Sequence, residues 1–439
     1  MSNTTTTTAG ALSRRTSSWQ PRRALVWVAF AIALIVAPLI FRSSLALTML
    51  SQMGYLIIIC LSYNMLLGQG GMLSFGHAVY TGLGSFIAIH TMNLAAKGSI
   101  PAPLVLIPLI GGLGGMFFAF VFGFVSTKKS GTTFAMITLG IGELVASMAL
   151  MFPTFFGGEG GITTNRTYGT PFLGFGFGPQ IEVYYLIAAY CFVCTVLMYA
   201  FTGTPLGRML NAVRDNPERV EFIGYNTQKV RYFSFIIAGF FAGIGGGLAA
   251  INFEIVNAAD SLNGLRSGGY LLFTFLGGAT FFFGPMIGAV LLVFASVLLS
   301  ELSKAWLLYL GLVFLLMVMF APGGVASLIM MNVRVALLGK FHRFYALYAG
   351  LVLAAAVMVA GAAAIVEMIY HMQLNAALGP TVRLATFELD TSSPKSWLIA
   401  CTLLVVGLAL FEMVRRRYVK VWGKAQEEIE FEIKRRETA

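Results

Sequence analysis

Apolar runs of roughly 20 residues recur from residue 24 to residue 414, and they constrain the fold more than any other feature of the sequence. A helix of that length crosses the ~30 Å hydrocarbon core of a membrane with its backbone hydrogen bonds satisfied internally. A membrane-spanning strand would need alternating apolar and polar residues, which these runs lack. A mean hydropathy of +0.82 and 11% charged residues also exclude a soluble globular domain. We therefore predict an all-α, polytopic membrane protein.

The apolar pattern predicts a helical bundle of about 10 core transmembrane helices plus about 2 C-terminal ones. Glycine-rich segments within the bundle are expected to be broken or re-entrant. The region 268–302 has two interpretations, because Gly284-Pro285 separates either two spans or two half-helices. The predicted spans lie near 24–41, 45–67, 72–94, 103–126, 132–152, 183–203, 232–252, 268–283, 285–302, 305–320, 345–370 and 397–414.

Composition divides the chain into four parts. The first is a Thr/Ser-rich and basic tail, expected to be disordered, and the last is a charged tail, expected to be helical. Between them lie the main bundle, which includes one long charged loop at 204–231, and an extension with two further spans. In chain order, the basic tail covers 1–23, the bundle 24–330, the extension 331–414 and the charged tail 415–439. The run 24–41 lacks a small-residue cleavage site before the next span, which favours a retained helix over a signal peptide.

The basic residues indicate how the chain is oriented. Starting from a cytoplasmic N-terminus, the predicted crossings place the 204–231 loop, the basic segment 321–343 and the C-terminal tail in the cytoplasm. Both termini are therefore expected to be cytoplasmic. Because the Lys and Arg residues flank spans, the net charge of +11 reflects orientation in a membrane, and we expect no nucleic-acid partner.

The charged loop 204–231 carries signals for two short helices. Thr204-Pro205 and Asn216-Pro217 each combine an N-cap side chain with proline at the first helical position, and Gly224 is placed to end the second helix. An apolar stripe follows the first start at helical spacing, at Leu206, Met209, Leu210 and Val213. The loop could lie on membrane lipid, but its mixed charges favour a groove on a protein.

Three sequence blocks resemble the permease subunits of ABC importers, specifically the LivM-type branched-chain amino acid permease family. They span about 280 residues in the family's order. The first is YNMLLGQGGMLSFGHAVYTGLGSF, the second is the charged loop, and the third is LGGATFFFGPMIGAV followed by APGGV. The chain departs from the family pattern at Gly323, and the residues after about 330 lie beyond the family core.

The resemblance implies a permease subunit in a bacterial inner membrane that moves branched-chain amino acids or a related small polar solute. It implies cytosolic ATPase subunits, a homologous second permease and an extracytoplasmic solute-binding protein as partners. The chain has no P-loop, so we expect ATP and Mg to be used by the ATPases, with no cofactor bound here and no enzymatic activity of its own. By resemblance, the ATPase-coupling residues are Gly207, Arg208, Ala212, Arg214, Asp215, Asn216, Glu218 and Gly224.

Alternative functions remain open at this point. Permeases for urea, short amides or other small carboxylates have closely similar sequences in the same family. An ion-coupled secondary carrier is a different class, and it would need coupling carboxylates near the middle of the membrane, where only Glu143 qualifies.

Polar residues inside the apolar segments are candidates for the translocation pathway, because an ionisable group is costly in a membrane. They are Asn64, Ser74, His77 and Glu143. For His77 the alternative is a structural hydrogen bond to backbone, and for Glu143 it is a bond that joins two helices. The four histidines are scattered, so no metal site is expected, and the four cysteines lie in apolar spans, so no disulfide is expected.

Glycines recur at the spacing that lets membrane helices approach closely. They are Gly239, Gly243 and Gly247, with further pairs at Gly111/Gly115 and Gly284/Gly288. On the outer side, Glu254, Asp260 and Arg266 are candidates for contact with a solute-delivering protein. The Gly-rich loop 153–182 is a candidate for the same contact or a plain connector.

Overall fold

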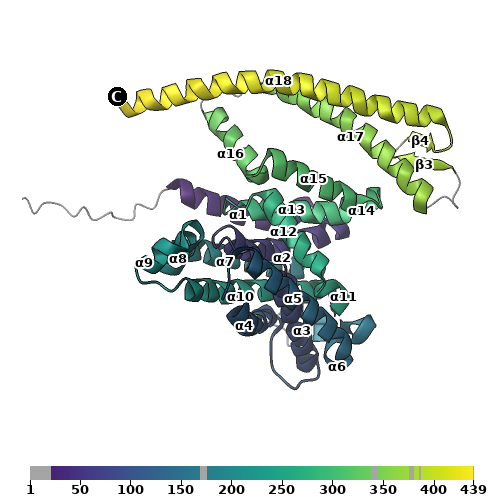
Figure 1. Ribbon diagram of the computed structural model, residues 1–439. Coiled ribbons are helices and arrows are strands. Elements are labelled where there is room, and N and C mark those ends of the chain that lie inside the picture. The colour runs from purple at the N-terminus through teal and green to yellow at the C-terminus, as the bar shows by residue number, and fades with distance from the viewer. Residues whose placement is uncertain (1–20, 169–175, 338–343, 375–379, 385–386, 439) are drawn as a thin grey trace, which may run out of the picture.

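The computed structural model describes residues 21–168, 176–337, 344–374, 380–384 and 387–438, and helices dominate it (Figure 1). The predicted tail 1–23 lies almost wholly outside these residues. The first half contains α1 (Pro21–Ile40), α2 (Ser44–Leu67), α3 (His77–Ala96), η1 (Leu104–Leu106), α4 (Ile107–Ser126), α5 (Gly131–Met151), α6 (Pro153–Phe156), η2 (Gly158–Gly160), β1 (Ile162–Thr163), η3 (Arg166–Tyr168) and α7 (Gln180–Gly203).

The second half begins with the charged loop. It contains α8 (Pro205–Asp215), α9 (Pro217–Phe222), α10 (Thr227–Phe253), β2 (Ile255–Val256), α11 (Ala258–Ser261), α12 (Gly264–Gly277), α13 (Gly284–Val293), the π-helical η4 (Phe294–Leu299), α14 (Ser300–Leu302), α15 (Trp306–Phe320), α16 (Gly324–Leu337), α17 (Tyr345–Leu374), β3 (Thr381–Leu384), β4 (Phe387–Asp390) and α18 (Pro394–Thr438).

Eight helices of the described part are long and apolar enough to cross a membrane, or nine if a bent pair forms one span. This confirms a polytopic α-helical protein but gives fewer spans than the twelve predicted. Residues 68–76 are not helical, so the predicted span 72–94 begins only at His77. The predicted span 305–320 is α15, which bends by 53° into α16.

The region 268–302 forms a helical hairpin. Its second half, Gly284–Leu302, is one of the eight candidate spans, whereas α12 has only 14 residues and packs back against α13. A Cβ atom at Gly277 or Gly288 would strike the backbone of the opposite helix at Gly284 or Phe273, respectively. Close backbone contact therefore fixes the hairpin, and hydropathy alone does not reveal such a contact.

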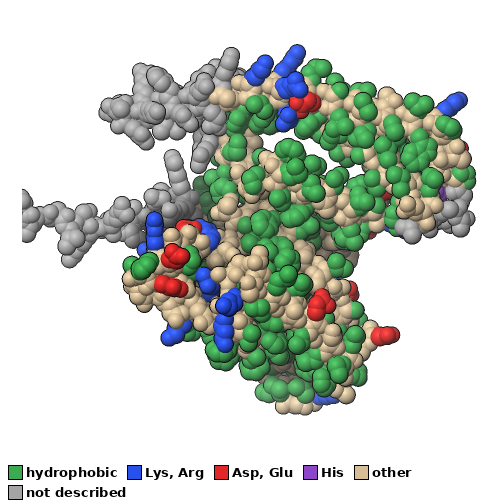
Figure 2. Space-filling model, in the orientation of Figure 1, with side chains coloured by type: hydrophobic (Ala, Val, Ile, Leu, Met, Phe, Trp, Pro, Cys, Tyr) green, Lys and Arg blue, Asp and Glu red, His purple; other side chains and the backbone are tan. Residues whose placement is uncertain are grey.

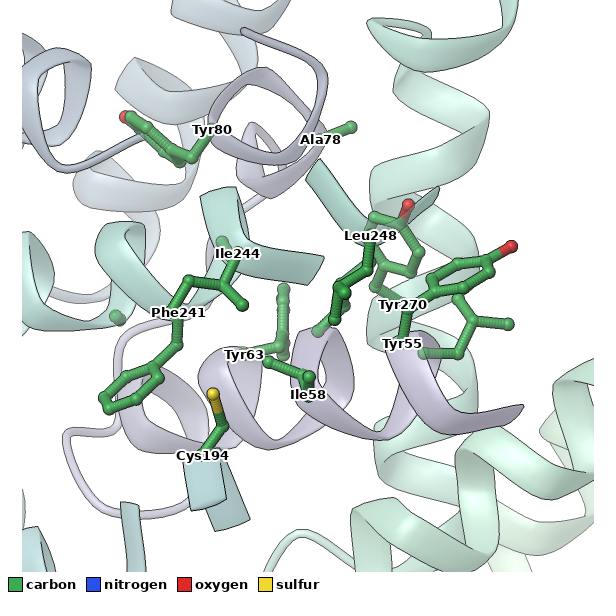
Figure 3. Close-up of a cluster of buried hydrophobic side chains, with 14 of the residues drawn as sticks. Tyr55, Ile58, Tyr63, Ala78, Tyr80, Cys194, Phe241, Ile244, Leu248 and Tyr270 are labelled. Carbon is green, nitrogen blue, oxygen red and sulfur yellow. The ribbon is translucent and has the colours of Figure 1, made fainter. Parts of the chain in front are cut away.

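The core lies where α10 packs against α2, α3 and α4. The glycines of α10 form much of this contact: a Cβ at Gly84 would lie 2.6 Å from Cα of Gly243, and one at Gly115 would lie 2.5 Å from the carbonyl oxygen of Gly239. Since the hydrophobic effect does not hold helices together in lipid, close packing of this kind takes its place. Large side chains fill the rest, including Tyr63, Phe241 and Ile244 (Figure 3).

The C-terminal extension is a helical hairpin of α17 and α18, closed at one end by the antiparallel pair β3–β4 (Figure 1). Within the described residues it contacts the rest of the molecule through an apolar cluster around Val335 and Phe344 and through polar bonds. Glu367 of α17 accepts hydrogen bonds from the hydroxyls of Ser303 and Tyr309, and Tyr348 donates to Asn332 of α16. α18 continues as a helix through residue 438, as the charged tail predicted.

The charges are unevenly distributed over the surface. In Figure 2, Lys and Arg side chains gather around α8 and α9, whereas the surface over the central helices is largely hydrophobic. The start of α1 and the end of α18 lie toward the same side as α8 and α9 in Figure 1. At the opposite end, β1 pairs with β2, and Arg166 forms an ion pair with Glu254 at 3.7 Å.

Candidate functional site

The charged loop folds into the two helices that its caps predicted. The Thr204 hydroxyl accepts from the backbone N–H of Gly207 at 3.2 Å, and the Asn216 side chain accepts from the N–H of Arg219 at 3.1 Å. Gly224 has a positive φ of 91°, a conformation that suits glycine at the end of a helix. On the inner face of α8, Leu210 and Val213 are buried, as the stripe predicted.

Two contacts fix α8 against the bundle. A Cβ at Gly207 would collide with the backbone of Phe201 and Thr202, so α8 begins tightly against the end of α7. Arg214 donates to the carbonyl oxygen of Gly68, and its side chain also packs on Gly71. Helix α8 is thus bonded directly to the non-helical segment 68–76.

The outer face of α8 and α9 is accessible. Arg208, Asp215 and Glu218 are exposed, whereas Ala212 is half-buried against the core. Asp215 receives a hydrogen bond and an ion pair from Arg214 at 2.9 Å. The turn after α9 exposes large apolar side chains: Phe222 is 88% exposed and Ile223 65%. An apolar tip with mixed charges beside it is a surface of the kind that docks into a protein groove.

His77 lies at the first residue of α3 and is fully buried. Its Nε2 lies 2.9 Å from the Ser62 hydroxyl, which itself donates to the Ile59 carbonyl oxygen at 2.7 Å. Since the Ser62 proton is used there, the His77 Nε2–H is the donor in this bond. Its Nδ1 has no hydrogen-bond partner within the described residues. The partner of His77 is therefore a side chain rather than the backbone.

The other three predicted pathway residues do not converge on His77. Asn64 and Ser74 are buried, and the Asn64 side-chain oxygen and Ser74 hydroxyl have no hydrogen-bond partner among the described residues. Glu143 is exposed on α5, and its carboxylate lies near Gly264 at the start of α12.

Segment 68–76 and the first turn of α3 together bond to four elements, α2, α5, α8 and α12, through bonds that the sequence did not reveal. Besides the Arg214 bond, the Tyr63 hydroxyl donates to the Ser74 carbonyl oxygen at 2.9 Å. The Phe75 N–H donates to the Thr138 hydroxyl at 3.1 Å. One turn further, the Ala78 N–H donates to the Ser267 hydroxyl of α12 at 2.9 Å. Lone hydroxyls inside apolar helices were the only sequence signal for these residues.

A cavity of about 230 Å³ lies on the other side of this network, toward the end of the molecule opposite α8. Residues of α2, α3, α10, α11 and α12 line it, including two that the sequence placed at the outer rim, Asp260 and Arg266. The lining combines apolar residues such as Ile59 and Phe253 with the hydroxyls of Tyr55 and Tyr270.

The segments of the third sequence block also meet in space. Gly278 has a φ of 115°, and a Cβ on Gly324 would lie 2.5 Å from Cα of Gly278, so the two glycines pack with no side chain between them. At Gly323, the position of the family departure, the carbonyl oxygen lies toward Gly278, whereas a Cβ would meet the Ser327 side chain at 2.6 Å.

Comparisons with known proteins agree with this arrangement. The family "Branched-chain amino acid transport system / permease component" matches residues 45–322. The LivM permease proteins of the high-affinity branched-chain amino acid transport systems of Escherichia coli K12 and Salmonella typhimurium LT2 are each 25% identical over 292 residues, which cover 61% of this chain and 67% of the relative. No solved structure matches the chain. The chain therefore belongs to the branched-chain amino acid transport permease family, and it is a multi-pass membrane transport subunit rather than an enzyme.

Proposed function

We propose that the chain is the permease subunit of an ABC importer in a bacterial inner membrane. It carries branched-chain amino acids or a related small polar solute, with both termini in the cytoplasm. Separate ATPase subunits dock on α8 and α9, a homologous second permease completes the pore, and an extracytoplasmic binding protein delivers the solute. The ATPases bind ATP and Mg and hydrolyse the ATP, and this chain binds no cofactor.

The observation that carries the proposal is the bond between Arg214 and the Gly68 carbonyl oxygen. It connects an exposed docking surface to the segment 68–76, which is bonded to α2 and α5, while Ala78 at the start of α3 is bonded to α12. A displacement of α8 by a partner would therefore move the start of α3 and the hairpin α12–α13. Such a connection is what a transport subunit needs if the energy arrives from outside its own chain.

The ion-coupled carrier is the weaker candidate. It needs an intramembrane carboxylate that changes protonation, and Glu143 is exposed with no hydrogen-bond partner assigned to its side chain in the described structure. A carrier of that class would also have no reason to expose the apolar tip at Phe222 and Ile223.

The test is Arg214→Gln, in the chain expressed with its candidate ATPases, second permease and binding protein. We expect ATP-dependent uptake in proteoliposomes to fall at least about tenfold, since hydrogen bonds to charged groups contribute about 1.5–3 kcal/mol. The ATPases should still co-purify, because the exposed tip is unchanged. The control is Lys129→Gln, an exposed basic residue outside the two helices. Equal uptake by the two variants, or uptake by this chain without any ATPase, would refute the proposal.

A further inference from the structure

We propose that the cavity beside α12 is a binding site for a small zwitterionic solute, with Arg266 holding its carboxylate and Asp260 facing its ammonium group. This inference rests on the proposed function and adds to it a solute site within the permease itself.

The size of the cavity suits a small solute. Its volume of about 230 Å³ is below the ~300–1,000 Å³ of sites that take drug-sized ligands. On one side the wall is apolar and includes Ile59, Ala249 and Phe253. This side suits a short hydrocarbon group, whereas the charged residues lie among the lining residues of α11 and α12.

Arg266 lies beside a cluster of hydroxyl-bearing residues. Tyr55, Thr81 and Tyr270 line the cavity together with it, Tyr270 is one turn further along α12, and the Thr81 hydroxyl donates to the Ala78 carbonyl oxygen at 3.0 Å. Tyr55 lies beside Tyr270 in the same cluster (Figure 3). A guanidinium has five N–H donors in a planar fork, a shape that matches a carboxylate bidentately.

Asp260 supplies the opposite charge. Its carboxylate accepts from the Asn257 side chain at 3.2 Å, and its residue is exposed at the cavity rim. Although Asp260 acts electrostatically on Arg266, no ion pair joins the two described side chains. Arg266 and Asp260 are the charged residues that line the cavity. A zwitterion satisfies both charges, whereas an anion would face Asp260 and a neutral amide would leave both charges without a partner.

The position of Arg266 also links the site to the coupling surface. The next residue, Ser267, accepts the hydrogen bond from the Ala78 N–H. Segment 68–76 lies just before Ala78 and is bonded to Arg214 of α8. Movement of α8 therefore has a bonded route to the carboxylate anchor, and release of the solute can be coupled to that movement.

The experiment measures binding to the permease–ATPase complex in nanodiscs without the binding protein, by calorimetry. The probes are the zwitterions L-alanine and L-leucine, and two leucine analogues, 4-methylpentanoate without the amine and leucinamide without the carboxylate. We expect at least one zwitterion to bind saturably and both analogues to bind at least about tenfold more weakly, since charge-assisted contacts are lost. Absence of binding by both zwitterions, or equal binding of zwitterion and analogues, would overturn the proposal.

Variants then assign the two ends. Arg266→Gln should weaken zwitterion binding about tenfold or more and remove the preference over leucinamide. Asp260→Asn should instead remove the preference over 4-methylpentanoate. Lys304→Gln and Glu301→Gln, exposed charges that do not line the cavity, are the matched controls. Arg266→Lys, which keeps the charge, should restore part of the binding and guards against misfolding. If either variant kept the wild-type preference, its assigned role would be wrong.

The two proposals fail separately. If the wild-type assembly showed no ATP-dependent uptake, the transport function would be refuted. Normal uptake, combined with unchanged ligand preference in Arg266→Gln and Asp260→Asn, would refute the site alone.

Discussion

Gly207 gives the sharpest test of how α8 is attached to the bundle. In a Gly207→Ala variant the new Cβ meets the carbonyl oxygen of Phe201, with the Phe201 carbonyl carbon and Cα of Thr202 both at 3.1 Å. All three are backbone atoms, so no side chain can rotate away and α8 must move. Overpacking of this kind costs about 1–3 kcal/mol, which corresponds to roughly a 5- to 150-fold loss of the native arrangement.

The assay compares Gly207→Ala with Gly203→Ala, four residues earlier, where a Cβ meets nothing within 4 Å. Both changes swap glycine for alanine near the same helix junction, so they differ mainly in this clash. We expect ATP-dependent uptake per assembled complex to fall strongly in Gly207→Ala and to stay near wild type in Gly203→Ala. If the two variants transported equally well, the tight junction between α7 and α8 would have no role in coupling.

Two further predictions concern stability. Gly243→Ala places a Cβ against backbone atoms of α4, at 3.0 Å from Cα of Gly112, and should lower the stability measured by thermal melting in nanodiscs by about 1–3 kcal/mol. Gly140→Ala, which has open space around the new Cβ, is the control and should melt like the wild type. Equal melting of the two variants would contradict the packing argument. Glu367→Ala leaves the hydroxyls of Ser303 and Tyr309 without their acceptor. We expect amide hydrogen exchange in α17 to become faster, because the free energy of opening should fall by about 1–3 kcal/mol. Exchange at the wild-type rate would show that these bonds do not hold the extension in place.

Local signals in the sequence were enough to predict the coupling loop. The caps at Thr204 and Asn216 act on N–H groups within three residues, so the two helices follow from neighbouring side chains. The stripe with Leu210 predicted the buried face of α8 because helical spacing alone decides which residues share a face.

Features that depend on distant contacts were not predictable in this way. Hydropathy treats α12 and α13 as two spans because it measures how apolar a segment is and not which backbone it touches. The partner of His77 is Ser62, 15 residues earlier on α2, and only the folded arrangement brings these two side chains together. The sequence placed Arg266 near the outer rim but could not reveal that it also lines a cavity, because the other lining residues come from distant helices.

Helix α10 connects the two ends of the molecule as a single rod. It starts beside α9, where Thr227 donates to Glu221 at 2.7 Å, and its last turns line the cavity at Ala250 and Phe253. With 27 residues at 1.5 Å each, the rod is about 40 Å long. A tilt of about 5° about its middle would shift each end by roughly 2 Å, enough to change a hydrogen-bond distance decisively. Gly243 faces α3 and α4 with backbone against backbone, so along that contact such a tilt would meet no side chain of residue 243.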